Sequence, residues 1–450
     1  MDLSALDISR IQFAFVVTLH IIFPSFTIGL AAWLAVLEWR HQATGNPIYR
    51  TLFDFWLKIF AVSFGMGVVS GIVMAFQFGT NWSVMSERTG SIQGPLLGYE
   101  SFTAFILEAT FLGVVLFGRR RASPRMYLTS CVLVALGTTL SSFWIMANNS
   151  WMQVPVGYTI DAAGRVIPTD WRLIIGGHVF LVRWIHMLLA AYLTTAMVVS
   201  ATGAWYLRKG IHTAAAKSML IWGMALMAIF TPIQIGFGHR AGDIIRDHQP
   251  AKFAAVEGRW ESGTRAPLVM LAWPDNKAEK NSFEISIPVI GSIIDGGNAD
   301  SYQRGIKDIP SDERAPFLVP FYGFRIMFGA GVLMLFIGWY GSWRNYRHNI
   351  ERARWFLGLT ALSFPMGWIA VMAGWYTAEV GRQPWIVTGL LRTADAVTPS
   401  LTLNHAITSL TLYVLVYAIV FGFGFRYLWK LFQKGPADKV LATTPNGGAL

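Results

Sequence analysis

A glutamate and an arginine, three residues apart, lie at the edge of an apolar run that predicts a membrane span. The string GWYTAEVGRQPW (residues 374–385) follows this run, residues 355–373, and contains Glu379 and Arg382. Side chains three apart on a helix share a face, and Pro384 then prevents another regular turn. An ionisable residue at membrane depth is costly and usually faces a cavity, so the pair indicates a functional site. An ion pair that anchors the helix end at the interface is the alternative, and charge alone favours neither.

Two histidines and a methionine lie in other apolar runs. His20 is in LHIIFPSF, His186 in LVRWIHM and Met327 in FRIM. Each could serve packing or interhelical hydrogen bonding. Imidazole is also a common heme ligand, and a His–Met pair suits a six-coordinate electron-transfer heme. Arg183 and Arg325 precede His186 and Met327 closely, and a guanidinium there could pair with a heme propionate. For Arg183, snorkelling to the interface is the alternative.

Four further charged residues could move protons or act on a substrate. Glu100 and Glu108 lie in YESFTAFILEATF, and eight residues on a helix separate them by about 12 Å along its axis. Two such carboxylates suit a proton relay, or a heme ligand plus a relay. Glu100 could also lie at the interface, whereas burying an unpaired Glu108 is costly. Lys252 and Glu257 occur in AKFAAVEGRWE, which by itself is an unremarkable solvated segment.

The composition is that of a membrane protein. Of 450 residues, 54% are hydrophobic and only 14% are charged, with 43 Gly and 19 Trp, which are enriched in spans and at their interfaces. The net charge of +11 comes from Lys and Arg scattered over short loops rather than clustered on one face. Membrane topology explains this pattern better than nucleic-acid binding does.

The apolar runs predict an all-α integral membrane protein with nine transmembrane helices. Apolar runs of about 20 residues are long enough to cross a bilayer. The predicted spans are residues 11–37, 53–78, 98–118, 126–150, 178–207, 219–238, 319–340, 355–376 and 403–429.

The charges of the short loops predict the orientation. Most of their Lys and Arg follow the first, third, fifth and seventh spans or lie in the tail, so the N-terminus is expected outside and the C-terminus in the cytoplasm. The chain then divides into helices one to six (1–238), a long outer loop (239–318), helices seven to nine (319–434) and a tail (435–450). The loop is polar and is expected to be an extramembrane loop or small subdomain, and the tail is expected to be disordered.

These strings together resemble subunit I of the cytochrome bd-type quinol oxidases, including the cyanide-insensitive group with a short outer loop, the Q-loop. The similarity runs over nearly the whole chain. It is carried by RIQFAF, FQFGTNW, FILEATF, WMQ, AWYLRKG, KFAAVEGRWE, FRIMFG and GWYTAEVGRQPW. The chain departs from some relatives in its short loop and in GFGHRAGD, where His239 stands at a position that is acidic in those relatives.

The resemblance implies three hemes near the outer face of the membrane. Low-spin heme b would be bound by His186 and Met327. A high-spin heme b and a heme d would take His20 and Glu379 as axial ligands, with Glu100 beside that pair. Which of these two hemes binds which residue stays open, and in some members heme b replaces heme d.

The resemblance also implies roles for the remaining charged residues. Lys252 and Glu257 match residues of quinol oxidation, Arg325 and Arg382 match arginines near the hemes, and Glu108 matches a position on a proton path. The family oxidises ubiquinol or menaquinol at the periplasmic face of the bacterial inner membrane. It reduces O2 to water and generates proton motive force without pumping. A second large subunit, and often a small single-helix subunit, would be partners.

Two other functions are compatible with buried carboxylates or heme ligands. A proton-coupled transporter would explain Glu100, Glu108 and Glu379, but not the His–Met pair or the nearby arginines. An electron-transfer cytochrome would explain the hemes without oxygen reduction. Heme absorption would separate the transporter from both alternatives, and quinol-driven oxygen uptake would identify the oxidase.

Overall fold

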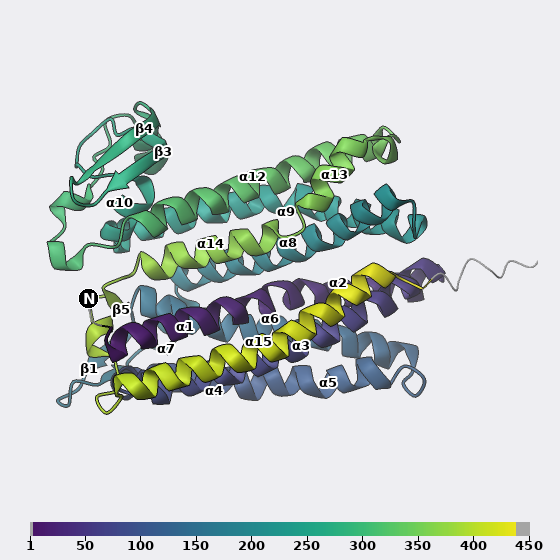
Figure 1. Ribbon diagram of the computed structural model, residues 1–450, viewed down its shortest axis with the longest axis horizontal. Helices are drawn as coiled ribbons and strands as arrows, with labels where there is room; N and C mark the ends of the chain where they lie inside the picture. The colour runs from purple at the N-terminus through teal and green to yellow at the C-terminus, as the bar shows by residue number, and fades with distance from the viewer. Residues whose placement is uncertain (1–2, 438–450) are drawn as a thin grey trace, which may run out of the picture.

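The computed structural model describes residues 3–437, and these form an almost entirely helical protein (Figure 1). In this part of the chain, eight helical segments are long and apolar enough to cross a membrane, and a bent helix pair makes a ninth if it counts as one span. The eight are α1–α2 (Ala5–Ile22 and Pro24–Thr44), α3 (Pro47–Thr80), α4–α5 (Ser83–Tyr99 and Ile106–Phe117), α6 (Pro124–Gln153), α7–α8 (Trp171–Gly176 and His178–Lys209), α9 (Thr213–His248), α12 (Leu318–Tyr346) and α15 (Leu403–Lys434). The expected tail, 435–450, lies mostly outside the described residues.

The bent pair is α13 (Arg354–Leu362) and α14 (Met366–Val380), whose axes differ by 40°. Pro365 lies at the break, where its ring and missing N–H prevent a continuous helix. Ser363 donates its hydroxyl to the carbonyl of Leu359 and so satisfies part of the interrupted backbone. The second helix of the pair, α14, then carries Glu379 at its last turn.

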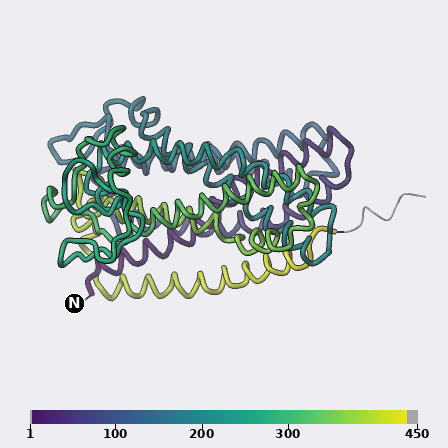
Figure 2. Tube along the Cα trace, turned by 90° about the horizontal axis from the view of Figure 1, so that it is seen from above, coloured from purple at the N-terminus to yellow at the C-terminus, as the bar shows by residue number. Residues whose placement is uncertain are grey.

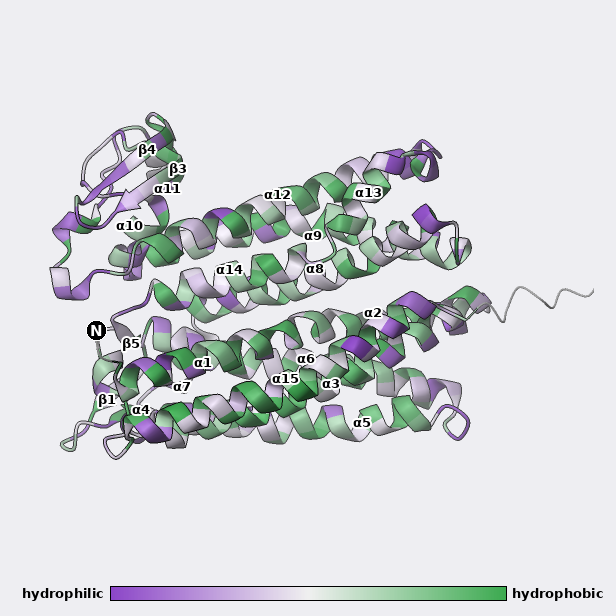
Figure 3. Ribbon diagram, viewed as in Figure 1, coloured by the Kyte–Doolittle hydropathy of each residue, from purple (hydrophilic) through white to green (hydrophobic). Residues whose placement is uncertain are grey.

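The long helices pack side by side along one axis. Helices α8 and α9 form an antiparallel pair, with α12 and α14 against them, while α2 packs on α3, α6 and α8. Helix α15 lies against α1 and α3 at the edge of the bundle, where Figure 2 shows it as a separate yellow helix. Figure 3 shows mainly hydrophobic residues along the middle of the helices and hydrophilic residues at their ends, as a membrane requires.

Two helices extend well beyond their apolar runs. Helix α9 continues to His248, ten residues beyond the expected end at residue 238. The extension is polar and is supported by the ion pairs of Asp243 with Arg240 and Arg246, each at helical spacing. Helix α4 begins at Ser83 rather than near residue 98. Hydropathy marks the part of a helix that faces lipid, whereas the hydrogen-bonded helix continues through polar residues.

A single π-helical turn, Glu100–Phe105, separates α4 from α5. The extra residue in each π turn changes the angular position of the residues that follow it. Glu100 and Glu108 therefore do not have the relation expected for an unbroken α-helix. Such turns are frequent at functional sites.

The long segment after α9 is a small folded unit rather than an open loop. It contains α10 (Pro250–Glu257), a hairpin of β3 (Leu268–Asp275) and β4 (Lys280–Ile287), and α11 (Ile290–Gly296). Its core includes Trp260 and Phe317, whose rings stack with centroids 4.2 Å apart. The unit lies at the same end of the bundle as the N-terminus (Figure 1).

Candidate functional site

One cavity of about 2130 Å³ lies between the helices at the end of the bundle that carries the α10–α11 unit. Drug-sized ligands occupy pockets of roughly 300–1,000 Å³, so this cavity has room for more than one large group. Ten of the eleven candidate residues line it: His20, Glu100, Glu108, Arg183, His186, Glu257, Arg325, Met327, Glu379 and Arg382. The eleventh, Lys252, lies in the first turn of α10 and contacts this set through a glutamine described below.

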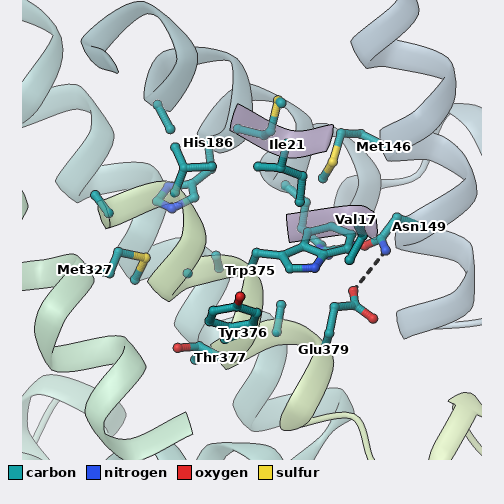
Figure 4. Close-up of a pocket in the computed structure, with 18 of the residues that line it drawn as sticks. Val17, Ile21, Met146, Asn149, His186, Met327, Trp375, Tyr376, Thr377 and Glu379 are labelled. Atoms are coloured by element: carbon teal, nitrogen blue, oxygen red, sulfur yellow. Dashed lines mark hydrogen bonds between the residues drawn. The ribbon is translucent and has the colours of Figure 1, made fainter. Parts of the chain in front are cut away.

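His186 of α8 and Met327 of α12 lie on one side of the cavity, and Glu379 with Asn149 lies on the other side of Trp375 (Figure 4). The Nδ1 atom of His186 is buried without a hydrogen-bond partner, and its Nε2 atom is 3.4 Å from the side-chain amide nitrogen of Gln234. An unpaired buried imidazole nitrogen is costly in a purely structural role. It is an available donor atom for a metal.

Glycines make room for the candidate ligands. A Cβ atom at Gly374 would lie 2.7 Å from the sulfur of Met327. At Gly238 it would lie 3.2 Å from Cε1 of His186, and at Gly71 it would lie 3.1 Å from Cε1 of His20. Each of the three side chains therefore occupies space that a larger residue on the neighbouring helix would take.

His20 is held in a defined tautomer. Its Nδ1 atom is 3.0 Å from the hydroxyl oxygen of Ser70, and that hydroxyl is also 3.0 Å from the carbonyl of Met66 and 2.9 Å from that of Gly67. Because Ser70 donates its only proton to the backbone, it accepts from Nδ1–H of His20. The lone pair is then on Nε2, as a metal ligand requires, and the serine acts as the outer partner that orients the ring.

Glu379 is surrounded by donors rather than left as an isolated charge. One carboxylate oxygen accepts from the amides of Asn149 at 2.9 Å and Gln153 at 3.0 Å, and the other forms an ion pair with Arg382. Arg183 is bonded inside the protein: it donates to the side-chain oxygen of Asn149 at 2.6 Å and to the hydroxyl of Ser150 at 2.9 Å. The expected Glu379–Arg382 pair is therefore present and is supported by a second arginine through Asn149.

Lys252 is buried, with 2% of its surface exposed. Its ammonium donates to the side-chain oxygens of Gln153 and, at 2.8 Å, Gln249. Burial, followed by repulsion from nearby arginines, lowers the pKa of Lys252 well below its usual range. Since Gln153 also donates to Glu379, one side chain connects the lysine of α10 to the glutamate of α14.

Asn149 and Gln153 were not among the candidate residues, although Gln153 lies in the string WMQ. Both lie in the last turns of α6. The available signal was their spacing, because polar amides four residues apart at the end of an apolar helix share a face. The partner that this face meets is visible only in the folded chain.

Glu257 ends α10 and is also buried. Burial is the main cause that raises the pKa of Glu257 to about 7, and the nearby carboxylate of Asp295 raises it further. Asp295 is itself paired with Arg259 at 3.0 Å, and both side chains are buried. A carboxylate with a pKa near neutral can accept and release protons under working conditions.

Arg325 holds the α10–β3 region to α12. It donates to the backbone carbonyls of Val256 at 2.8 Å and Met270 at 3.0 Å, and also to Val269. Its guanidinium lies 3.5 Å from the ring centroid of Phe321. The residue before Glu257 is thus tied directly to the helix that carries Met327.

Glu100 and Glu108 face the cavity from the π turn and the start of α5. Glu100 accepts from the hydroxyl of Ser141 at 2.8 Å. Glu108 is 6% exposed, and its Oε1 atom is buried without a hydrogen-bond partner. A buried carboxyl oxygen without a partner suits a group that exchanges protons with water or another carboxyl.

The distribution of donors fits iron held in a porphyrin. Within residues 3–437, no three His, Cys, Asp or Glu side chains gather as a protein-only metal site. Instead, single donor groups from different helices face a cavity much larger than a metal ion needs. In a heme the porphyrin supplies the equatorial ligands, so the protein need provide only one or two axial donors. The unpaired nitrogen of His186 and the oriented imidazole of His20 meet that requirement.

Comparisons with known proteins agree with this geometry. The family model for cytochrome bd terminal oxidase subunit I matches residues 8–436. The chain is 34% identical over 431 residues to cytochrome bd ubiquinol oxidase subunit 1 of Bacillus subtilis (strain 168), covering 93% of this chain and 91% of that protein. It is 31% identical to cytochrome bd-II ubiquinol oxidase subunit 1 of Escherichia coli (strain K12), covering 96% and 97%.

A solved structure has the same fold. The bd oxidase from Geobacillus thermodenitrificans superposes with a TM-score of 0.89 at 29% sequence identity, covering 96% of this chain and 99% of that chain. Family, relatives and fold all agree over nearly the full length. The chain therefore belongs to the cytochrome bd terminal oxidase subunit I family, whose members are heme-containing membrane subunits of quinol oxidases.

Proposed function

We propose that this chain is the heme-bearing subunit of an oxidase that takes electrons from quinol at the periplasmic face and reduces O2 to water. Protons from quinol are released outside, and protons for water come from the cytoplasm through Glu108 and its neighbours. Charge then crosses the membrane without a pump. The main support for the proposal is a hydrogen-bond connection from the buried Lys252 through Gln153 to Glu379. It joins the loop unit to the cavity that would hold the hemes.

The proposed hemes are of two kinds, which differ in whether two protein side chains or one would hold the iron. His186 and Met327 would hold a low-spin heme b, and His20 and Glu379 would each hold one high-spin heme, a heme b and a heme d, or heme b in place of heme d. Bound heme would supply electron transfer at the site with two protein donors and oxygen binding at the sites with one. The glycines beside three of these residues support the assignment because they leave the donor atoms unobstructed.

Glu257 of the loop unit would act directly on quinol, while Arg325 of α12 and Lys252 of the loop unit would hold neighbouring groups in place. Glu257, at the cavity wall, would accept a proton from a quinol hydroxyl, since its raised pKa suits it to a general base near neutral pH. Arg325 would keep the backbone beside Glu257 in place through its bond to Val256. Lys252 would hold the side chains of Gln153 and Gln249 in one arrangement.

Glu100, Glu108 and Ser141 would hold protons on the opposite side of the reaction. Glu100 and Ser141 are already hydrogen-bonded, and Glu108 has a carboxyl oxygen without a partner on the same cavity. This arrangement supports a path on which protons are held at Glu108 before they are used.

The proposed topology is nine spans, with the α10–α11 unit outside as the Q-loop, the N-terminus periplasmic and the C-terminus cytoplasmic. The α13–α14 pair would be the eighth span, broken at Pro365. The chain would work in a bacterial inner membrane with a second large subunit and a small single-helix subunit. Relatives are named as ubiquinol oxidases, and a Bacillus subtilis relative at 26% identity is named a putative menaquinol oxidase subunit. The proposed substrate is therefore ubiquinol or menaquinol.

The test uses the purified complex in lipid nanodiscs. A pyridine hemochrome assay and a reduced-minus-oxidised spectrum should show heme, and quinol should drive oxygen uptake. Glu257→Gln should lower that uptake severely at full heme content. Its matched control is Glu261→Gln, four residues away on the exposed surface, where turnover should be unchanged.

Two outcomes would refute the proposed oxidase, and a third would refute the role of Glu257. A colourless preparation made with adequate heme supply would exclude the heme-bearing function and favour a transporter. Heme reduction by quinol without oxygen uptake would indicate an electron-transfer cytochrome. Equal turnover of Glu257→Gln and wild type would remove the loop glutamate from the mechanism.

A further inference from the structure

The β3–β4 hairpin presents a strongly apolar face outside the bundle. Phe283 is 92% exposed, and Trp273, Ile285 and Ile287 of the two strands are exposed as well, none of them lining the cavity. Soluble surfaces rarely expose apolar side chains in such a contiguous group, and one that does so usually meets a partner or a membrane. The hydrophobic core of the loop unit is separate from this face. Val269 and Ala272 contribute to that core from the opposite side of β3.

Irregular backbone produces this face. The pairing of β3 with β4 shifts register between Val269 and Leu271 and again between Leu271 and Trp273, so the regular alternation of faces is lost along β3. Phe283 has a φ of 50°, a left-handed conformation that is unfavourable for a bulky side chain. The fold therefore accepts strain in order to hold a large ring away from the protein. In water, no favourable contact would offset the backbone strain at Phe283 or the exposure of its ring.

The hairpin lies beside the first turns of α12, not beyond the end of this helix. The hydroxyl of Tyr322 donates to the carbonyl of Ala272 at 2.7 Å, and Arg325 donates to Met270. Figure 1 shows the hairpin to the side of this end of α12, outside the outline of the helical bundle. In the proposed topology, an element beside the outer end of a membrane-spanning helix lies against the surface of the bilayer.

Its apolar face is continuous with a surface that faces lipid. Helix α12 exposes Leu318, Val319 and Ile326 along its first turns, and none of these side chains lines the cavity. The rings of Trp273 and Tyr322 are 6.3 Å apart, so an interfacial aromatic pair joins the hairpin to that helix. Trp and Tyr concentrate where headgroups meet acyl chains.

We propose that the β3–β4 hairpin is a membrane-interface anchor whose outward face, centred on Phe283 and Trp273, is covered by lipids of the outer leaflet. The proposal rests on the proposed topology, in which this end of the bundle is outside. The anchor holds the loop unit at the bilayer surface. The same strand lines the cavity with Leu268, Val269, Met270 and Leu271. Glu257 is therefore kept next to the membrane in which a long-tailed quinol dissolves.

The bimane fluorophore attached at a single cysteine tests where the hairpin lies. Phe283→Cys is placed in a complex freed of other reactive thiols, including Cys131→Ser, and reconstituted in nanodiscs of phosphatidylethanolamine and phosphatidylglycerol. The control is Asp300→Cys, in the same loop unit, where the native side chain is 80% exposed. Nitroxide-bearing lipids should quench the fluorophore at position 283, and iodide in water should not. The control should show the reverse.

A second variant tests the anchor by function. Phe283→Asp with Ile285→Asp introduces charges on the lipid face. Aspartate tolerates a positive φ better than phenylalanine, so position 283 gains no strain. The KM for a long-tailed quinol should rise several-fold, while the KM for a short-tailed soluble quinol and the heme spectrum stay as in wild type. Asp300→Asn should leave both KM values unchanged.

The outcomes are separable from those of the proposed function. Iodide quenching at position 283 equal to that at position 300 would overturn the anchor. Protection of position 283 from both quenchers would overturn it too, since a companion protein would then cover the face. An unchanged KM for the long-tailed quinol in the double variant would also overturn the anchor. If the wild-type complex failed to consume oxygen with quinol, the oxidase would be refuted, while the quenching result at position 283 would still be decided independently.

Discussion

Replacing Gly374 by alanine should remove the methionine ligand of the low-spin heme without unfolding the protein. Gly374 lies on α14, and its added Cβ would be 2.7 Å from the sulfur of Met327 on α12. Ordinary non-bonded contact is about 3.5–4.0 Å, so the sulfur must move by about 0.8 Å to reach the short limit of that range. Metal ligands must be held within roughly 0.5 Å of their working position, and this displacement exceeds that tolerance.

A graded pair of variants on α9 makes the argument quantitative. Gly238→Ala places a Cβ 3.2 Å from Cε1 of His186, so the ring reaches the short limit of ordinary contact by moving about 0.3 Å, compared with about 0.8 Å for the sulfur of Met327. The smaller shift is within the tolerance, and the low-spin signal should remain with altered intensity or position. Gly236→Ala, two residues earlier on the same helix, meets nothing within 4 Å and should be silent.

Optical and electron paramagnetic resonance spectra of the reduced and oxidised complex distinguish the three variants. Gly374→Ala should convert the low-spin signal to high-spin at unchanged total heme by pyridine hemochrome. Because alanine is favoured over glycine in a helix by about 0.5–1 kcal/mol, the melting temperature should not fall through helix propensity. A full low-spin signal in Gly374→Ala would refute Met327 as an axial ligand. Equal loss of the signal in Gly236→Ala would refute the steric argument.

Three further perturbations address other parts of the site. His186→Ala should abolish the low-spin signal and leave the high-spin hemes detectable by pyridine hemochrome; retention of the signal would reject this ligand. The raised pKa of Glu257, about 7, means that its proton-accepting form increases as pH rises through neutrality, so wild-type oxygen uptake should rise over that range. Glu257→Gln should lose this pH dependence. An unchanged pH profile in that variant would show that another group causes the dependence. Arg119→Met should leave the buried Glu38 carboxylate without its ion pair and cost about 3 kcal/mol, seen as a lower melting temperature with unchanged heme spectra. An unchanged melting temperature would show that the pair is not stabilising.

The membrane class and the helical architecture could be predicted from apolar runs because a bilayer leaves little choice. Backbone groups in lipid must be satisfied within the segment, so a long apolar run becomes a helix. The boundaries were less accurate, as α9 and α4 show. The polar end of α9 remains helical with ion pairs at helical spacing, which hydropathy does not detect.

The candidate residues themselves were identified by type and neighbouring motif. A carboxylate, an imidazole or an arginine inside an apolar run is costly, so its presence already indicates a function. The cavity collects His20, His186, Met327 and Glu379 from four different helices. Their roles as ligands remain predictions, which the heme spectra above test.

The folded β3–β4 hairpin was not predictable in this form. The expectation was a polar loop or small subdomain, yet the strands expose Phe283 and Ile285 on one face. Short segments with mixed polarity have weak local preferences. Contacts with α12, such as that of Tyr322 with Ala272, decide where they lie.

The amino-acid sequence by itself determined which segments enter the membrane and which costly polar side chains enter with them, because transfer into lipid depends on composition within one segment. Only the tertiary structure decided that Gln153 joins Lys252 to Glu379 and that glycines face three of the candidate ligands. Those relations depend on the rotation and crossing of separate helices. Packing between helices sets these, and no single stretch of sequence contains them.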